Sequence, residues 1–178
     1  MQALFFLIDA VLSFFCTLFL LRFMMQAMRV SFAGQIGNFV VALTNWAVKP
    51  LRRVIPGTGG FDWASLLAAL SLQLAFSAML VVLSSHGIGA DGGSSIVVTA
   101  VWLGVRNLLR LAVYILIGAL ILQAVLSWVN PYSPLAAPAN QLTRPLLDPI
   151  RRFVPLISGI DLSPLVAILL LQAALMFL

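Results

Sequence analysis

The chain has 178 residues, of which 62% are hydrophobic and only 8% are charged. A soluble domain carries about 45–50% apolar and about 25% charged residues, so this composition excludes an ordinary soluble domain and indicates a protein of the lipid bilayer. Ten Lys and Arg against five acidic residues give a net charge of +5. Because the basic residues lie beside apolar runs, we expect anionic phospholipid headgroups rather than nucleic acid as their partner.

Residue types that serve catalysis or metal binding are scarce. Cys16 is the single cysteine, His86 is the single histidine, and all five acidic residues are aspartates. One thiol excludes an intramolecular disulfide, and the set offers neither a familiar zinc site nor a nucleophile–base pair. We therefore expect no enzyme activity, no catalytic residue, no cofactor and no metal.

The first expected membrane span covers residues 3–25. It lacks a basic segment before it and a small-residue cleavage site after a short apolar core, so it is predicted to stay as a helix and not to be removed as a signal peptide. Its length suffices for the bilayer, which needs about 20 residues. Asp9 and Arg22 lie ~19 Å apart along such a helix, so they cannot pair and each must reach another helix or a membrane interface.

The next stretch is basic and rich in turn-forming residues. Gly34 and Gly37 predict a loop. After it, Thr44 or Asn45 can cap a short helix, and Pro50 suits the first turn of a second one. The sequence therefore predicts a loop followed by two short helices.

The second of these short helices is predicted to lie in the membrane interface. Leu51, Val54 and Ile55 follow helical spacing and form one apolar face. Arg52 and Arg53 leave by the opposite face, toward lipid phosphates.

Asp62 directly precedes the second expected span, residues 63–83. A carboxylate in this position can cap the helix, which we favour over coordination of an ion. Gln73 lies near the middle of the span. A stripe of small residues predicts the face that packs on other helices: Ala64, Ala68, Ser71, Ala75 and Ala78.

A Gly- and Ser-rich segment, residues 84–95, is predicted to be a flexible linker with His86 in a solvated loop. The apolar stretch 96–129 that follows would measure ~51 Å as one helix, more than a single crossing needs. We therefore favour residues 96–105 in or near the membrane interface and a third span over 108–128, although one long helix stays open.

The apolar stretch 96–129 carries three further polar side chains of interest. Arg106 and Arg110 share one helical face, and either is a hypothetical partner for Asp9 in a buried ion pair. Gln123 lies further along this span.

A second basic element follows, in which Asp148 is predicted to cap a helix that begins at Pro149 and carries Arg151 and Arg152. The fourth expected span is residues 162–178. Asp161 is predicted to cap it, and Gln172 aligns with Gln73 of the second span.

The two basic elements are copies of each other, 99 positions apart, over residues 44–67 and 143–166. The alignment has no gap and matches Thr44 with Thr143, Pro50 with Pro149, Arg52-Arg53 with Arg151-Arg152, Pro56 with Pro155, Gly60 with Gly159, and Asp62 with Asp161. A repeat of this quality predicts two units, residues 1–83 and 96–178, joined by the linker 84–95. The expected fold is an all-α membrane protein with four transmembrane helices in two tandem parallel repeats, each a helix, a basic amphipathic interfacial element and a helix.

Basic residues concentrate in the segments between the first and second spans and between the third and fourth, while 84–95 has none. The positive-inside rule then places both basic loops in the cytoplasm and both termini outside.

At the repeated element the sequence resembles the YggT family (also called YlmG) of small bacterial and plastid membrane proteins. The family pattern has a proline, two arginines, an aliphatic residue with proline, a glycine and an aspartate that opens the next span. It is matched by Pro50, Arg52, Arg53, Ile55-Pro56, Gly60 and Asp62, and again by Pro149, Arg151, Arg152, Val154-Pro155, Gly159 and Asp161. The second repeat also has the Ser127-Trp128 and Asn130-Pro131 turn, from which the first repeat departs.

The resemblance implies a bacterial inner-membrane scaffold or assembly factor, linked to osmotic-stress tolerance or to envelope and division organisation. Its expected partners are anionic phospholipid headgroups and membrane or division proteins, with a homo-oligomer also open. The alternative is a small ion or solute channel or transporter component. For that role the polar candidates near the middle of the spans are Gln73, Gln123, Gln172 and Ser71.

Overall fold

The computed structural model describes residues 2–55, 57, 59–85, 93–130, 132–154 and 161–178. Its elements are six helices: α1 (Gln2–Ala27), α2 (Gln35–Val54), α3 (Trp63–Ser85), α4 (Gly93–Val129), α5 (Ala136–Arg151) and α6 (Ser163–Phe177). Several residues named above lie outside this part of the chain: Pro56, His86, Pro131, Pro155 and Gly159. The expectation of an all-helical protein is confirmed for the part that is described.

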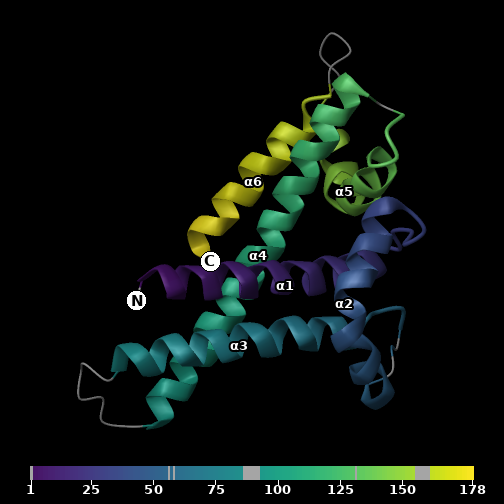
Figure 1. Cartoon of the computed structure of the whole chain (residues 1–178). Coiled ribbons are helices and arrows are strands. Elements are labelled where there is room, and N and C mark those ends of the chain that lie inside the picture. The colour runs from purple at the N-terminus through teal and green to yellow at the C-terminus, as the bar shows by residue number, and fades with distance from the viewer. Residues whose placement is uncertain (1, 56, 58, 86–92, 131, 155–160) are drawn as a thin grey trace.

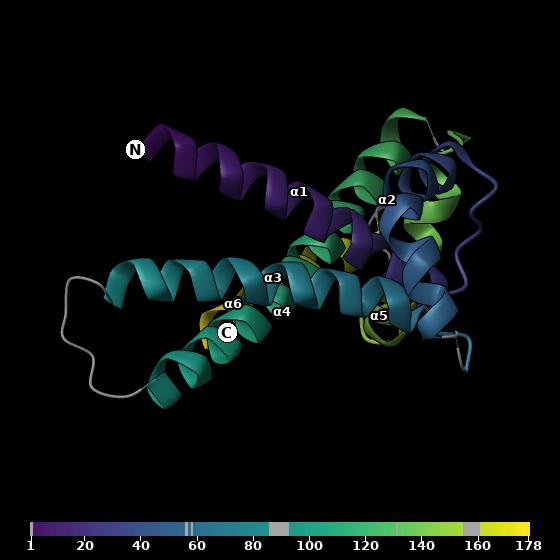
Figure 2. The same cartoon turned by 60° about the horizontal axis from the view of Figure 1, so that its bottom comes forward.

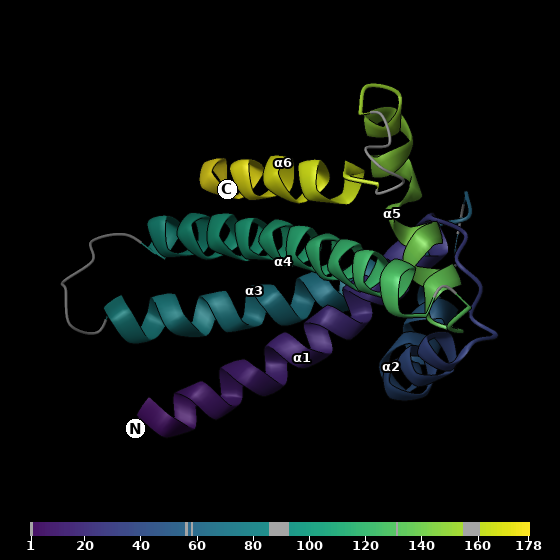
Figure 3. The same cartoon turned by 90° about the horizontal axis from the view of Figure 1, so that it is seen from above.

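α1 and α3 run side by side, α6 runs beside α4, and the two pairs cross at an angle (Figure 1). α3 packs against both α1 and α4, and α6 packs against α4. Seen from above, α2 and α5 lie at the same end, while both termini point toward the other end (Figure 3). α1 diverges from α3 toward its N-terminus (Figure 2), which matters for a cavity described below.

Three helices are long and apolar enough to cross a membrane: Phe6–Ala27, Trp63–Leu83 and Val97–Val129. These helices are typical of a membrane protein, because a bilayer crossing needs about 20 apolar residues. α6 is also apolar but has only 15 residues, so it is shorter than an ordinary span.

Residues 96–129 belong to one long helix, the alternative that the sequence left open, and not to two separate segments. α4 is one continuous helix of 37 residues, about 55 Å long. No proline interrupts it, and its exposed Trp102 and Trp128 lie 26 residues apart, or about 39 Å. This distance is similar to the ~40–45 Å thickness of a bilayer with its headgroup regions.

The expected loop before the second span is present at residues 28–34 and includes Gly34, but it ends before Gly37, and the expected pair of short helices is wrong. α2 is a single helix that includes Gly37, Thr44 and Pro50. One face of α2 is buried, at Gly37, Val40, Thr44 and Val48, and this periodic face explains why packing overrides the local turn signals. Thr44 therefore lies in the helix interior and caps nothing.

α5 departs from the prediction in the same way. It begins at Ala136 and runs through Pro145, Asp148 and Pro149 to Arg151, so Asp148 does not cap a helix that starts at Pro149. The carboxylate of Asp148 instead pairs with Arg144, one turn earlier, at 3.3 Å.

The main apolar core lies where α1 meets α2 and α3. Its largest fully buried side chains include Met25, Val40 and Val48. A smaller cluster joins Leu120, Leu147 and Ala167 in the second repeat. The core therefore sits toward the end of the bundle that carries α2 and α5.

The predicted small-residue stripe of α3 covers only part of its buried face. Ala64 and Ala68 are buried, but Ser71 and Ala75 are exposed. The buried small residues continue instead through Ser65, Ala69 and Ser77. The expected linker is also shorter than 84–95, since α3 ends at Ser85 and α4 begins at Gly93.

Candidate functional site

Asp62 is the centre of a buried charge cluster at the start of α3. Its side chain is 1% exposed. Its Oδ2 accepts hydrogen bonds from Arg52 Nη2 at 2.6 Å and from the Ser65 hydroxyl at 2.6 Å, and its Oδ1 accepts one from Arg52 Nε at 3.2 Å. The backbone N–H of Ser65 also reaches Oδ1 at 3.4 Å, as expected of a carboxylate that caps α3.

Arg22 brings a second positive charge to this carboxylate from α1. Its Nε lies 3.3 Å from Asp62 Oδ2, an ion-pair contact without hydrogen-bond geometry. Its Nη1 donates to Thr44 Oγ1 at 2.7 Å and to Asn45 Oδ1 at 3.1 Å. The Thr44 hydroxyl donates in turn to the carbonyl of Val40 at 2.6 Å, so α2 holds the guanidinium in place.

The environment of Asp62 favours the charged carboxylate. Burial by itself raises the pKa of this group. The hydrogen bonds from Arg52 and Ser65 and the charges of Arg52 and Arg22 outweigh burial and hold the pKa of Asp62 below its usual range. The cluster therefore carries two positive charges against one negative charge.

The second repeat contains a related but lighter arrangement. Arg151 Nε donates to Asp161 Oδ2 at 3.0 Å, and the Ser163 N–H donates to Asp161 Oδ1 at 2.9 Å. The side chain of Asp161 is 30% exposed. Burial raises the pKa of Asp161, but the hydrogen bonds from Ser163 and the interaction with Arg151 lower it below its usual range.

A neutral residue stands where the first repeat has Arg22. The Thr143 hydroxyl, in the position that matches Thr44, bonds to the buried side chain of Gln123 and to the carbonyl of Ala139. Gln123 thus contacts Thr143 as Arg22 contacts Thr44, but it brings no charge. Asp161 faces one arginine where Asp62 faces two.

The paired arginines of the two basic elements have different surroundings. Arg52 and Arg151, the first of each pair, turn back to the aspartate ten residues later. Arg53 and Arg152 are exposed and have no ion-pair or hydrogen-bond partner among the described residues. Only the second arginine of each pair is therefore left wholly available to a ligand.

Polar residues from three helices line a second candidate site, within the spans. This cavity of about 280 Å³ lies where α1 has diverged from α3. It is lined by Asp9 and Ser13 of α1, Gln73 and Phe76 of α3, and Asn107, Arg110, Leu111 and Tyr114 of α4. Three of the polar residues singled out in the sequence, Asp9, Gln73 and Arg110, are thus brought together.

The hypothetical ion pair of Asp9 with Arg106 or Arg110 is not formed. The carboxylate of Asp9 accepts a hydrogen bond from Ser13 at 3.4 Å and pairs with neither arginine. Arg106 does not line the cavity. Gln172, the repeat counterpart of Gln73, is exposed on α6.

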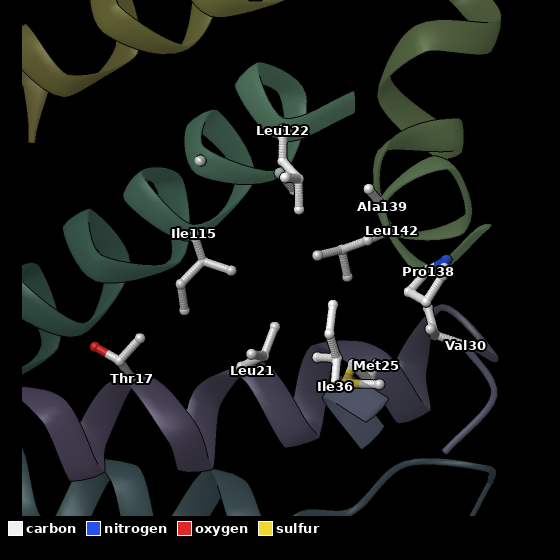
Figure 4. A pocket seen from close by; sticks show the side chains of 12 residues that line it. Thr17, Leu21, Met25, Val30, Ile36, Ile115, Leu122, Pro138, Ala139 and Leu142 are labelled. Carbon is white, nitrogen blue, oxygen red and sulfur yellow. The ribbon is translucent and has the colours of Figure 1, made fainter. Parts of the chain in front are cut away.

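A second cavity, of about 240 Å³, is apolar and lies between α1 and α2 of the first repeat and α4 and α5 of the second (Figure 4). Leu21 and Met25 of α1 face Ile115 and Leu122 of α4 across it, and Leu142 of α5 closes one side. Among the residues that line this cavity, Thr17 has the only polar side chain, so the cavity suits an apolar ligand.

Sequence reasoning missed several residues of these sites. Thr44, Asn45, Gln26 and Ser65 hold the buried cluster, and Ser13 and Tyr114 belong to the polar cavity. One available signal was the repeat itself. It keeps Thr44, Arg52 and Asp62 in register with Thr143, Arg151 and Asp161, which is typical of side chains that contact one another.

The structure thus defines a helical protein of the membrane type, with two related sets of three helices and, in each set, an arginine that pairs with the aspartate ten residues later. The sequence profile of the CCB3/YggT family matches residues 1–83 and 102–178, which correspond to these two sets. The chain belongs to this family.

Its relatives are spread across several bacteria. An uncharacterised protein of Pseudomonas aeruginosa is 36% identical over 162 residues, which are 90% of this chain and 80% of the relative. A Vibrio alginolyticus protein described by its place in the proC 3′ region is 35% identical, over 98% of this chain and 92% of its own length. The uncharacterised protein YggT of Escherichia coli is 35% identical, over 96% of this chain and 86% of its own length. No solved structure matches.

Proposed function

We propose that the protein is a non-enzymatic scaffold or assembly factor of the bacterial inner membrane, with α2 and α5 as its working surface. In this proposal all four apolar helices cross the bilayer as two parallel repeats, the basic loops face the cytoplasm and both termini lie outside. The scaffold would act in envelope or division organisation or in tolerance of osmotic stress.

One observation carries the proposal: the two basic helices lie at the same end of the long helices (Figure 3). Each is amphipathic, with a buried periodic face and an exposed basic end. Trp46 of α2 and Trp128 of α4 are exposed near this end, as expected of aromatic side chains at a headgroup layer. Arg53 and Arg152 can then bind anionic headgroups without first breaking an ion pair or hydrogen bond to another described residue.

Lipid selectivity tests the anchoring part of the proposal. Each basic side chain near an anionic surface contributes about 1 kcal/mol, so the double variant Arg53→Gln/Arg152→Gln should weaken the preference for phosphatidylglycerol over phosphatidylcholine by roughly 30-fold. The measurement is native mass spectrometry of protein released from mixed-lipid nanodiscs. Arg106→Gln is the matched control and should keep the preference. An unchanged preference in the double variant would refute the anchoring function.

The scaffold part needs a protein partner at the same surface. Photo-crosslinking residues placed at positions 53 and 152 in cells should give the same discrete protein adduct, because the two positions are copies in the repeat. A crosslinker at Trp102, at the opposite end of α4, should not give it. If both positions formed adducts with lipid alone, the result would contradict the scaffold function and leave only the membrane-anchoring function.

The polar cavity favours the second candidate, an ion or solute pathway, because Asp9, Gln73 and Arg110 line it within the spans. Potassium and sodium flux in proteoliposomes tests this function. Gln73→Leu should abolish any flux that depends on the protein, and Gln172→Leu should not, since only Gln73 lines the cavity. Flux equal to that of empty liposomes would exclude these ions as substrates.

A further inference from the structure

The polar cavity contains two formal charges of opposite sign that the protein itself leaves apart. Arg110 has no hydrogen bond or ion pair with any described residue, and Asp9 has Ser13 as its hydrogen-bond partner, at 3.4 Å. Both belong to helices that can span a membrane. Asp9 is exposed and Arg110 is half-buried on the protein surface, so a ligand can reach both side chains. A charged side chain within a membrane span is costly unless an opposite charge or water meets it, so a group that pairs with both side chains would be favoured in this cavity.

The remaining lining groups define what can fill the space. Gln73 and Asn107 offer amide donors and acceptors, and Tyr114 offers a hydroxyl. Phe76 supplies an apolar wall. A volume of about 280 Å³ has room for a small molecule or for several waters, each of which occupies about 30 Å³ in the liquid.

We infer that this cavity is a binding site for a zwitterionic group, with anionic oxygens on Arg110 and an ammonium on Asp9. A guanidinium is matched to carboxylate and phosphate oxygens, and a carboxylate accepts from ammonium donors. A ligand with both charges neutralises both side chains at once, whereas a simple cation or anion leaves one of them unpaired. The ligand is either a free amino acid or the headgroup of a zwitterionic phospholipid such as phosphatidylethanolamine.

This inference does not rest on the lipid anchoring proposed for α2 and α5, because no residue that lines the cavity belongs to α2 or α5. Asp9 is eighteen residues before the end of α1 and Arg110 nineteen before the end of α4, so each is ~27–29 Å along its helix from the basic end. Binding also does not require transport.

The test uses purified full-length protein in nanodiscs. In the first arm, unbranched ω-amino acids from glycine to 6-aminohexanoate are titrated by calorimetry in phosphatidylcholine–phosphatidylglycerol nanodiscs. Affinity should peak at one chain length, because the site fixes the separation between its two charges. In the second arm, native mass spectrometry measures retention of phosphatidylethanolamine over phosphatidylglycerol.

Variants tie binding to the cavity. Asp9→Asn and Arg110→Gln should each weaken binding at least tenfold, while Arg106→Gln and Gln172→Leu leave it unchanged. The double variant Asp9→Arg/Arg110→Asp should bind the ligand again, because a zwitterion can bind in the reversed orientation. Circular dichroism and gel filtration of each variant confirm that it is folded.

The arms separate the outcomes. Amino-acid binding assigns a soluble ligand, and selective retention of phosphatidylethanolamine assigns a lipid headgroup. Absence of both in the wild-type protein, or binding that survives Asp9→Asn and Arg110→Gln in folded protein, overturns the inference. Neither result bears on the α2 and α5 surface, which the Arg53 and Arg152 variants test.

Discussion

Asp62 and Asp161 occupy matching positions in the two repeats but differ in burial and in the charges that face them. Asp62 is almost fully buried between Arg22 and Arg52, whereas Asp161 is partly exposed and meets only Arg151. A buried ion pair is costly to break from one side, because the remaining charge stays without solvent. The first cluster is therefore the more sensitive of the two.

Replacement of Asp62 by asparagine should destabilise the protein by about 3–5 kcal/mol, since Arg22 would stay buried without its carboxylate. Asp161→Asn breaks a partly exposed pair and should cost about 0.2–1 kcal/mol. Thermal unfolding of both variants in a non-ionic detergent checks the difference. Equal losses would mean that burial of the first cluster adds nothing to stability.

The stability supplied by Asp62 should also depend on pH. The pKa of Asp62 is lower in the folded protein than in the unfolded chain, where it is about 3.9, so protonation favours unfolding. The contribution is complete above pH ~4 and is lost as the pH falls through the folded-state pKa. The gap in melting temperature between wild type and Asp62→Asn should be constant from pH 7 to 5 and shrink toward pH 2. A gap that widens in acid would contradict this sign.

The sequence identified the charged side chains of both sites but not their neighbours. Arg22 was recognised as a residue that needs a partner on another helix, yet nothing local points to Asp62 or to Thr44. Asp9, Gln73 and Arg110 stood out because polar residues are rare in apolar spans. Their gathering depends on how α1, α3 and α4 are packed, which a single sequence does not specify.

Element boundaries show which local signals yield to packing. Gly37, Asn38 and Pro50 are turn formers in sequence but lie inside α2. Their helical state is stabilised by burial of Val40 and Val48 on the neighbouring helices, a nonlocal contribution. For α4 the sequence favoured two segments, because a helix was assumed to be no longer than the bilayer is thick. No proline stops the helix, however, and it continues beyond that length.

Close packing of α3 on α4 depends on Gly104. A Cβ atom at this position would lie 2.7 Å from Leu74 Cδ2 and 3.4 Å from Leu74 Cα. Gly104→Val should therefore force the helices apart at a cost of about 1–3 kcal/mol. Hydrogen exchange of residues 63–85 should become faster.

Gly118→Val is the matched control for that variant, because a Cβ at Gly118 meets nothing within 4 Å. Its exchange in residues 63–85 should equal that of the wild type. Unchanged exchange in Gly104→Val as well would show that the α3–α4 contact tolerates a larger separation.

For the whole molecule, the open question is whether the 15-residue α6 crosses the membrane. We expect it to cross, because it is apolar throughout and packs on α4. In a Cys16→Ala background, a membrane-impermeant maleimide applied to intact spheroplasts should label Leu178→Cys and not Arg53→Cys. Labelling of neither position would place the end of α6 on the cytoplasmic side and leave three spans.

For the whole molecule, the sequence predicted the features that depend on composition and on the internal repeat. The all-helical character and the family follow from apolar runs and from the repeated element, and they are confirmed, the former for the residues that the structure describes. The two segments that match the family profile also fit the predicted repeat. The arrangement of the helices does not follow, because α1 packs on α3 in its own repeat while α3 packs on α4 across the repeat boundary. Both contacts join apolar faces that look alike in sequence.

The buried cluster around Asp62 also imposes an order on synthesis. Arg22 leaves the ribosome forty residues before Asp62, which at ~5–20 residues per second is a delay of about 2–8 s. During this interval the guanidinium of Arg22 is present on α1, but Asp62, which supplies its carboxylate partner, has not yet been synthesised. We therefore expect α1 to reach its final packing only after α3 has been made. The second repeat, with Gln123 in the corresponding place, has no such waiting time.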